Sequence, residues 1–213
     1  EEIPAPDLKK AATAFIGQEA IHSREHKEYN DLMERQGLPA AQLDAFVWSF
    51  LDFIKKRTPR SFPLSATIAL EHFTALMGNS ILDYPETMEG SQEDYKRMWQ
   101  WHALEEIEHK SVAFDVYKAA GGTQGMLRKA MILMSWEFLV RYQLRSLVHM
   151  YRRDKPPFWR TLGQAFRFLF ARGGFVRGNW SHYWKFFRKG FHPNDIDDTA
   201  LLNRAVEVYG LAH

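Results

Sequence analysis

The sequence contains no cysteine among its 213 residues. This absence excludes a disulfide framework, thiolate metal sites and a cysteine nucleophile. It suits a reducing compartment, so we expect a cytoplasmic protein. Any metal ion would have to be bound by carboxylate oxygen and imidazole nitrogen.

Long apolar runs and strand signals are also scarce. The longest apolar run, residues 130–140, contains Glu137 and is too short to cross a bilayer. Nothing near Glu1 resembles a signal peptide. Long stretches show helical periodicity instead, so we expect an all-α protein, and at this length one domain with a sizeable core.

Acidic residues are almost missing from one segment. Residues 141–192 carry 12 Lys and Arg against one acidic residue, whereas residues 1–140 carry 15 against 21. Aromatic residues interleave with the cations between 154 and 192. Two explanations stay open: the segment packs on an acidic bundle, or it makes peripheral contact with a membrane. No helix-turn-helix or single-strand-binding pattern is present, so we expect no nucleic acid partner.

The breakers and caps of the chain delimit a series of helices. Successive stretches of helical periodicity end at helix-breaking residues, namely Gly37, the two prolines at 59 and 63, Pro85, Gly121-Gly122 and Pro156-Pro157. Ser91 with Asp94 resembles a capping box that opens the fourth helix. We predict helices over 8–35, 41–56, 64–82, 92–120 and 125–153, two short basic-aromatic helices separated by Gly173-Gly174, and a last helix over 199–209. Residues 1–153 would form a bundle and 154–213 a C-terminal helical extension packing on it.

Three of the predicted helices place metal-ligand side chains within their apolar faces. Glu19 and His22 share a face of the first helix with Leu8, Ala12, Phe15 and Ile16. Glu71 is alone among small and apolar residues on the third. His102, Glu106 and His109 follow at i, i+4 and i+7 on the fourth.

Two Glu-x-x-His pairs with a lone glutamate on another helix are typical of the dinuclear carboxylate centre of four-helix bundles. We therefore expect two divalent ions, iron first and manganese or zinc as alternatives. A network of buried ion pairs without metal is the structural alternative. His102 is either a ligand or orients a carboxylate.

Other titratable residues are expected to support the site rather than to form it. His26, Glu105 and Glu137 are candidates for orienting the ligands. Glu137 is also the internal candidate for a further carboxylate ligand, although an ion pair with Arg141 is the simpler explanation. His72 points away from Glu71 and is expected to be structural.

Three long motifs resemble a bacterial family described as predicted metal-dependent hydrolases. They are FIGQEAIHSREH at 15–26, ALEHFTA at 69–75 and WHALEEIEHKSVAFDVY at 101–117, with RGGF at 172–175 and GFHP at 190–193. The resemblance implies a ferritin-like centre with Glu19, His22, Glu71, Glu106 and His109 as ligands. His102 is similar to the additional histidine of the p-aminobenzoate N-oxygenase group. The resemblance also implies a further helix with a first glutamate upstream of position 1, so either a first bundle helix is missing or the fourth carboxylate comes from elsewhere.

These observations lead to a dinuclear oxidase or oxygenase acting on a small or lipid-like substrate. A hydrolase that uses metal-activated water is the alternative, followed by a bundle that binds metal or membranes without catalysis. The sequence leaves a homo-oligomer open.

Overall fold

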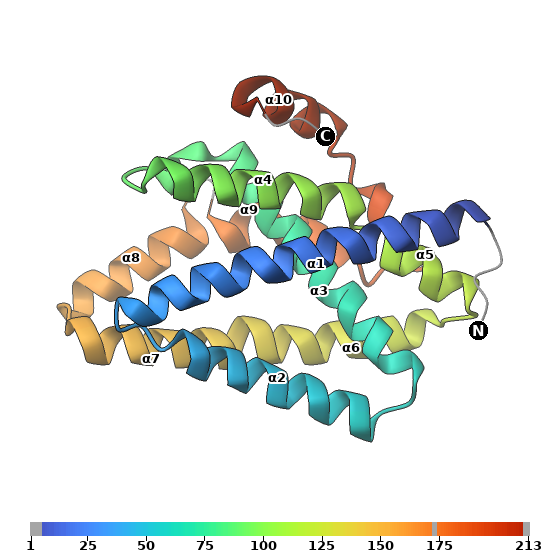
Figure 1. Cartoon of the computed structure of the whole chain (residues 1–213), viewed down its shortest axis with the longest axis horizontal. Helices are drawn as coiled ribbons and strands as arrows, with labels where there is room; N and C mark the ends of the chain where they lie inside the picture. Colours follow the sequence, from blue (N-terminus) through green and yellow to red (C-terminus); the bar gives the residue numbers. More distant parts are fainter. Residues whose placement is uncertain (1–5, 172–173, 211–213) are drawn as a thin grey trace. The chain divides into compact units, whose positions relative to one another are not determined.

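The computed structural model describes residues 6–171 and 174–210. Every regular element over these residues is helical, and none of them forms a strand (Figure 1). The predicted all-α class is therefore confirmed. The chain divides into two compact units, residues 1–69 with 115–156 and residues 70–114 with 157–213, so each unit takes parts from both halves of the sequence. The predicted division of the chain into a bundle over 1–153 and an extension over 154–213 stays a prediction.

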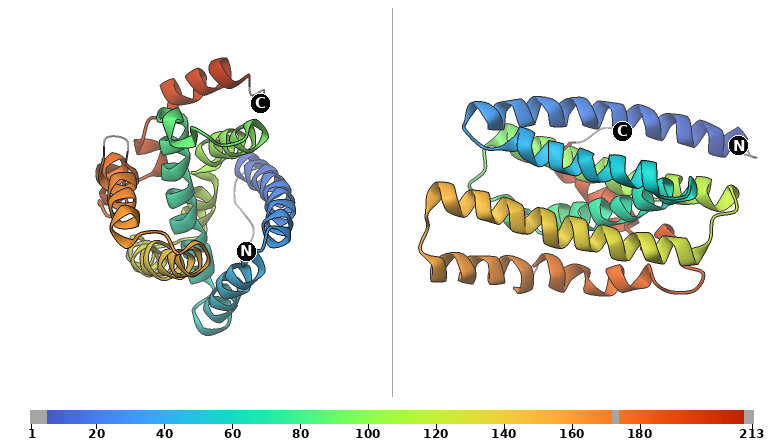
Figure 2. Two further views of the ribbon diagram at one scale, coloured as in Figure 1. Left: turned by 90° about the vertical axis from the view of Figure 1, so that its left-hand side faces the viewer. Right: turned by 90° about the horizontal axis from the view of Figure 1, so that it is seen from below.

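The first unit begins with two antiparallel helices. Helix α1 (Pro6–Arg35) ends at Gly37, whose φ of 77° lies in the left-handed region that glycine accepts readily. Helix α2 (Ala40–Arg57) follows and packs along α1 (Figure 2). The Glu34 carboxylate accepts a hydrogen bond from the Ala41 amide at 2.6 Å. It thereby satisfies one of the amides that a helix N-terminus leaves without an intrahelical partner.

The predicted helix over 125–153 is one continuous rod with a change of pitch in its middle. It consists of α6 (Gln124–Met134), the π-helical stretch η2 (Ser135–Tyr142) and α7 (Gln143–Asp154). Thr123 caps its start by accepting from the Met126 amide. Arg145 and Arg141 lie over the Phe46 ring of α2 at 4.3 and 5.2 Å, and these cation–π contacts connect the rod to α2. No pattern in the sequence predicted the π-helical stretch.

The second unit packs the end of α3 (Ser61–Asp83), α4 (Glu93–His109) and the C-terminal helices around a small apolar core. Helix α10 (Thr199–Tyr209) adds Ala205 to a cluster with Leu82, Leu104 and Ile107. Helices α3 and α4 approach closely at Gly78, because a Cβ added there would lie 2.7 Å from the Ala103 carbonyl oxygen. The remaining elements of the chain are α5 (Val112–Ala119), α8 (Phe158–Phe170), α9 (Phe175–Lys185) and the short 3-10 turns η1 (Pro85–Met88) and η3 (Pro193–Asp195).

A buried polar network fastens the elements of the second unit. Lys110 forms an ion pair with Asp198 and donates to the Ile196 carbonyl at 2.7 Å. Asn79 donates to the other carboxylate oxygen of Asp198 at 3.1 Å. Both charged groups are about nine-tenths buried, so each depends on the other for compensation.

Three details of the sequence prediction are wrong. The N-cap of α4 is Gln92, and no side chain caps this helix, so the capping box from Ser91 does not form. The helix predicted to reach residue 120 is interrupted after His109 and resumes as α5; Lys110 turns inward to Asp198 there, and neither glycine nor proline marks the place. Ile16, expected on the buried face of the first helix, is 66 % exposed.

The two basic-aromatic helices are present as α8 and α9. Gly174 lies at the start of α9, where a Cβ would meet the Leu169 backbone at 2.7 Å, so a larger residue would force these helix ends apart. Arg172 and Gly173, which belong to the predicted break and to the RGGF motif, lie outside the described residues. Over the described residues, no helix combines the length and the apolar character that crossing a membrane requires.

We expect Asp198→Ala to lower the free energy of unfolding by about 3–5 kcal/mol, because it leaves the Lys110 ammonium buried beside no counter-charge. The double substitution Lys110→Met/Asp198→Ala should recover a large part of that loss, since both charges are then gone. Urea unfolding of metal-free protein measures both values. Equal stability of the single and double variants would show that the buried ammonium is not the source of the cost.

Candidate metal centre

The first pair of candidate ligands lies on α1. Glu19 and His22 are three residues apart, so they project from neighbouring positions of one helical face. Their Oε1 and Nδ1 atoms are 3.5 Å apart. His22 is 2 % exposed and is the one buried residue of α1, whereas the Glu19 side chain is 37 % exposed. The expectation that both residues face the core holds for the histidine and only in part for the glutamate.

The second pair lies at the C-terminal end of α4. Glu106 and His109 repeat the same spacing, and both are buried. Each has a further partner within the second unit. His102 Nε2 lies 3.2 Å from Glu106 Oε1, and His109 Nδ1 lies 3.2 Å from Glu71 Oε2. The two helices that carry Glu71 and His109 also approach closely at Gly78.

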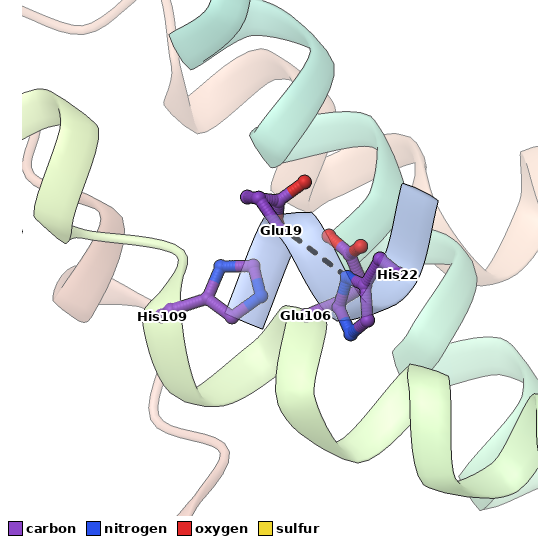
Figure 3. A group of neighbouring side chains, drawn as sticks. All are labelled: Glu19, His22, Glu106 and His109. Atoms are coloured by element: carbon purple, nitrogen blue, oxygen red, sulfur yellow. Dashed lines mark ion pairs between the residues drawn. The ribbon is translucent and has the colours of Figure 1, made fainter. Parts of the chain in front are cut away.

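Four of these side chains form a group that could hold a metal ion. Glu19, His22, Glu106 and His109 each offer one ligand atom, and the four atoms lie within 4.8 Å of one another (Figure 3). The group combines the Glu-x-x-His pair of α1 with that of α4, and the role of these residues as ligands stays a prediction.

The donor set and its spacing fit a divalent cation. Ligand atoms of one tetrahedral ion lie about 3.4 Å apart when the bonds are about 2.1 Å long. The Glu19–His22 distance within the group is 3.5 Å, and the distances from Glu106 to His102 and from His109 to Glu71 are 3.2 Å. The widest separation in the group of four, 4.8 Å, would require small side-chain adjustments. Oxygen and nitrogen donors of this kind suit zinc, iron and manganese.

Glu71 and His102 lie beside this group of four and are joined to it through their partners. Glu71 contacts His109, and His102 contacts Glu106. His102 also packs edge-on against Trp99 at 5.5 Å and lies 6.4 Å from the Trp101 ring. These two tryptophans were not singled out from the sequence, because aromatic residues on a helix face carry no signal that separates a site from a core.

The remaining sequence candidates occupy different surroundings. His26 and Glu105 are half-buried, and their predicted role in orienting ligands stays a prediction. Glu137 is buried in η2 and forms the expected ion pair with Arg141, so its charge is compensated within the same helical rod.

His72 is packed as a structural residue, as expected. It lies against the rings of Phe186 and Phe191, with centroid distances of 5.0 and 5.6 Å. Burial lowers the pKa of His72 to about 3, so the imidazole is neutral at physiological pH. A neutral ring among aromatics stabilises the packing beside Glu71 without adding charge to the site.

A cavity of about 650 Å³ lies in the first unit, at the junction of α3 with the turn before α6. Its lining includes Arg60, Tyr117 and Gly122, and none of the predicted ligands belongs to it. The tyrosine hydroxyl is engaged with the Thr123 backbone, donating to its carbonyl at 3.1 Å and accepting from its amide at 3.0 Å. We therefore assign no chemistry to this cavity.

The comparison with known proteins identifies a family but no individual relative. No curated protein and no solved structure matches the chain. A family model described as "predicted metal-dependent hydrolase" matches residues 1–197, which include all of the candidate ligands. The chain belongs to this family of predicted metal-dependent hydrolases.

Proposed function

We propose that the chain is a metal-dependent hydrolase whose metal centre is held by Glu19, His22, Glu106 and His109. The observation that carries the proposal is the grouping of these four donor atoms within 4.8 Å. The description of the family, which names metal dependence and hydrolysis, agrees with it.

The proposal extends to a second ion. Glu71 and His102 add a carboxylate and an imidazole at 3.2 Å from two members of the group, which brings the donor set to six. Six donors exceed the four that a single tetrahedral zinc ion takes. Three carboxylates with three imidazoles match the composition of dinuclear centres in helical bundles.

The residues of the chain have distinct roles in this scheme. The carboxylates of Glu19, Glu71 and Glu106 offset the positive charge of the ions, while neutral imidazoles hold their positions. A divalent ion in such a site lowers the pKa of water and polarises the bond to be cleaved. Trp99 and Trp101 pack around His102 and restrict its ring, and we propose that they limit access of bulk water to that side of the site.

A ferritin-like di-iron oxidase or oxygenase is the second candidate. The specific observation in its favour is the pair of Glu-x-x-His motifs on α1 and α4 together with Glu71 on α3, the ligand pattern of di-iron carboxylate bundles. In that case the substrate would be a small or lipid-like organic molecule and iron the metal. Hydrolysis and oxygen activation use the same ligands, so activity rather than the fold decides between them.

We expect the wild-type protein to retain about two metal ions per chain, and Glu106→Gln to retain one or fewer, because the neutral amide replaces a charged ligand. Glu108→Gln is the matched control, since the same change falls on an exposed residue of the same helix and should leave the metal content unchanged. Plasma mass spectrometry of purified protein gives the number of ions. Equal metal content in the wild type and in Glu106→Gln would contradict the proposed centre.

Glu71→Gln tests the second ion separately. We expect this variant to lose about one ion per chain and to keep the other, since the group of four is complete without Glu71. Saturating zinc should still raise its melting temperature, because an ion that binds only the folded state stabilises it. Retention of two ions in Glu71→Gln would remove this residue from the ligand set.

Activity under two metal conditions separates hydrolase from oxidase. A hydrolase loaded with zinc or manganese should cleave ester or phosphoester substrates without oxygen, and Glu106→Gln should abolish the cleavage. A di-iron oxidase should instead consume oxygen after reconstitution with Fe(II) and a reductant. Oxygen consumption without hydrolysis would favour the second candidate.

A further inference from the structure

Helix α8 presents an apolar face to solvent along its whole length. None of its residues is buried. Phe158, Leu162, Phe166 and Phe170 recur at intervals of four, and Trp159 adjoins them. These side chains are 44–79 % exposed, with the highest value at Trp159. A regular apolar stripe of this kind ordinarily lies against another surface.

The charge around this stripe has one sign. Arg160 and Arg167 lie on the opposite side of α8 and are exposed. From residue 155 to residue 194 the sequence has eight Lys and Arg and no acidic residue. The segment that carries the apolar face therefore has positive charges but no carboxylate of its own to offset them.

Helix α9 adds two exposed tryptophans within the same unit. Trp180 and Trp184 are 58 and 48 % exposed, and their rings meet edge to face at 5.6 Å. The other side of α9 is anchored, because Asn179 donates to Ser80 Oγ at 2.7 Å and Tyr183 stacks on Phe73. Tryptophan is enriched where an apolar phase meets water, since its ring is amphipathic.

We propose that α8, together with Trp180 and Trp184, binds the surface of an anionic lipid bilayer. Helix α8 would lie in the plane of the interface, with its aromatic face among the acyl chains and Arg160 and Arg167 at the headgroups. Charge complementarity selects this partner over a second copy of the chain, which would bring the same excess of cations to the contact. The proposal does not depend on the metal chemistry.

The first measurement is sedimentation with vesicles. We expect the full chain to bind phosphatidylcholine vesicles that contain one quarter phosphatidylglycerol, and to bind pure phosphatidylcholine vesicles at least tenfold more weakly. Binding to the anionic vesicles should fall as salt rises, because screening weakens the attraction between Lys or Arg and the surface. Equal binding to the two kinds of vesicle, or binding to neither, would overturn the proposal.

Substitutions in α8 locate the surface. Arg160→Gln/Arg167→Gln should weaken partitioning about 30-fold, because each cation near the anionic surface contributes roughly a factor of five. Trp159→Ser/Phe166→Ser should also abolish most binding through loss of apolar area. Neither change removes a buried side chain, so circular dichroism and melting should match the wild type.

Matched controls come from α2, which also carries exposed cations and aromatics. Lys55→Gln/Arg57→Gln and Trp48→Ser/Phe53→Ser make the same chemical changes at exposed positions. They should leave vesicle binding unchanged. An equal loss in the α2 controls would show nonspecific adsorption and overturn the assignment to α8.

Two other occupants of this surface give distinct results. If a second copy covers α8, light scattering should show an oligomer that Trp159→Ser/Phe166→Ser dissociates, and vesicles should not bind. If nucleic acid is the partner, an unrelated duplex should bind at low salt and vesicles should not displace it. Either result would replace the bilayer as the partner.

Discussion

The candidate centre depends on one constraint: the negative charge of its buried carboxylates must be offset, and the neighbouring groups are imidazoles. Glu71 and Glu106 are at least nine-tenths buried, and removing a charge from water is costly unless an opposite charge or a metal offsets it. Elsewhere the chain uses cations for this purpose, with Lys110 for Asp198 and Arg141 for Glu137. At the candidate centre the carboxylates lie beside histidines instead. Glu19 lies beside His22, Glu106 beside His102 and Glu71 beside His109. Histidine differs from lysine and arginine in being able to release its proton and bind a metal, which explains why this choice of partner points to a metal centre.

The sequence was informative wherever spacing alone determines geometry. Glu-x-x-His is a local pattern, so the pairing of Glu19 with His22 and the shared face of Glu106 and His109 follow from the helical repeat. The helix boundaries at Gly37 and Pro156 were predictable for the same reason, because these residues end helices through their own backbone. Which histidine meets which glutamate from another helix was not predictable. The contact of Glu71 with His109 depends on the packing of α3 against α4 and has no local signature.

The clearest error of the sequence prediction coincides with a tertiary contact. The interruption after His109 coincides with Lys110 turning toward Asp198, which is 88 residues away in the chain. The π-helical stretch over 135–142 lies in a sequence that ordinary helical periodicity also describes, and such stretches are frequent near functional sites. Here the stretch contains Glu137, the one buried acidic residue of that rod. Ile16 was expected inside because its face also holds His22, yet the exposed fraction of a side chain depends on what covers the helix.

Gly78 gives the site a property that its ligands alone would not have. A Cβ at position 78 would lie 2.7 Å from the Ala103 carbonyl oxygen, so a side chain there would force α3 and α4 apart. Side chains can shift rotamers to accommodate a guest, but two helix backbones in contact have little freedom to adjust. The backbone positions from which Glu71 and His109 approach each other therefore have little freedom to shift. If Glu71 and His109 bind a metal as proposed, a residue without any donor atom in its side chain would help to decide which ions fit between them.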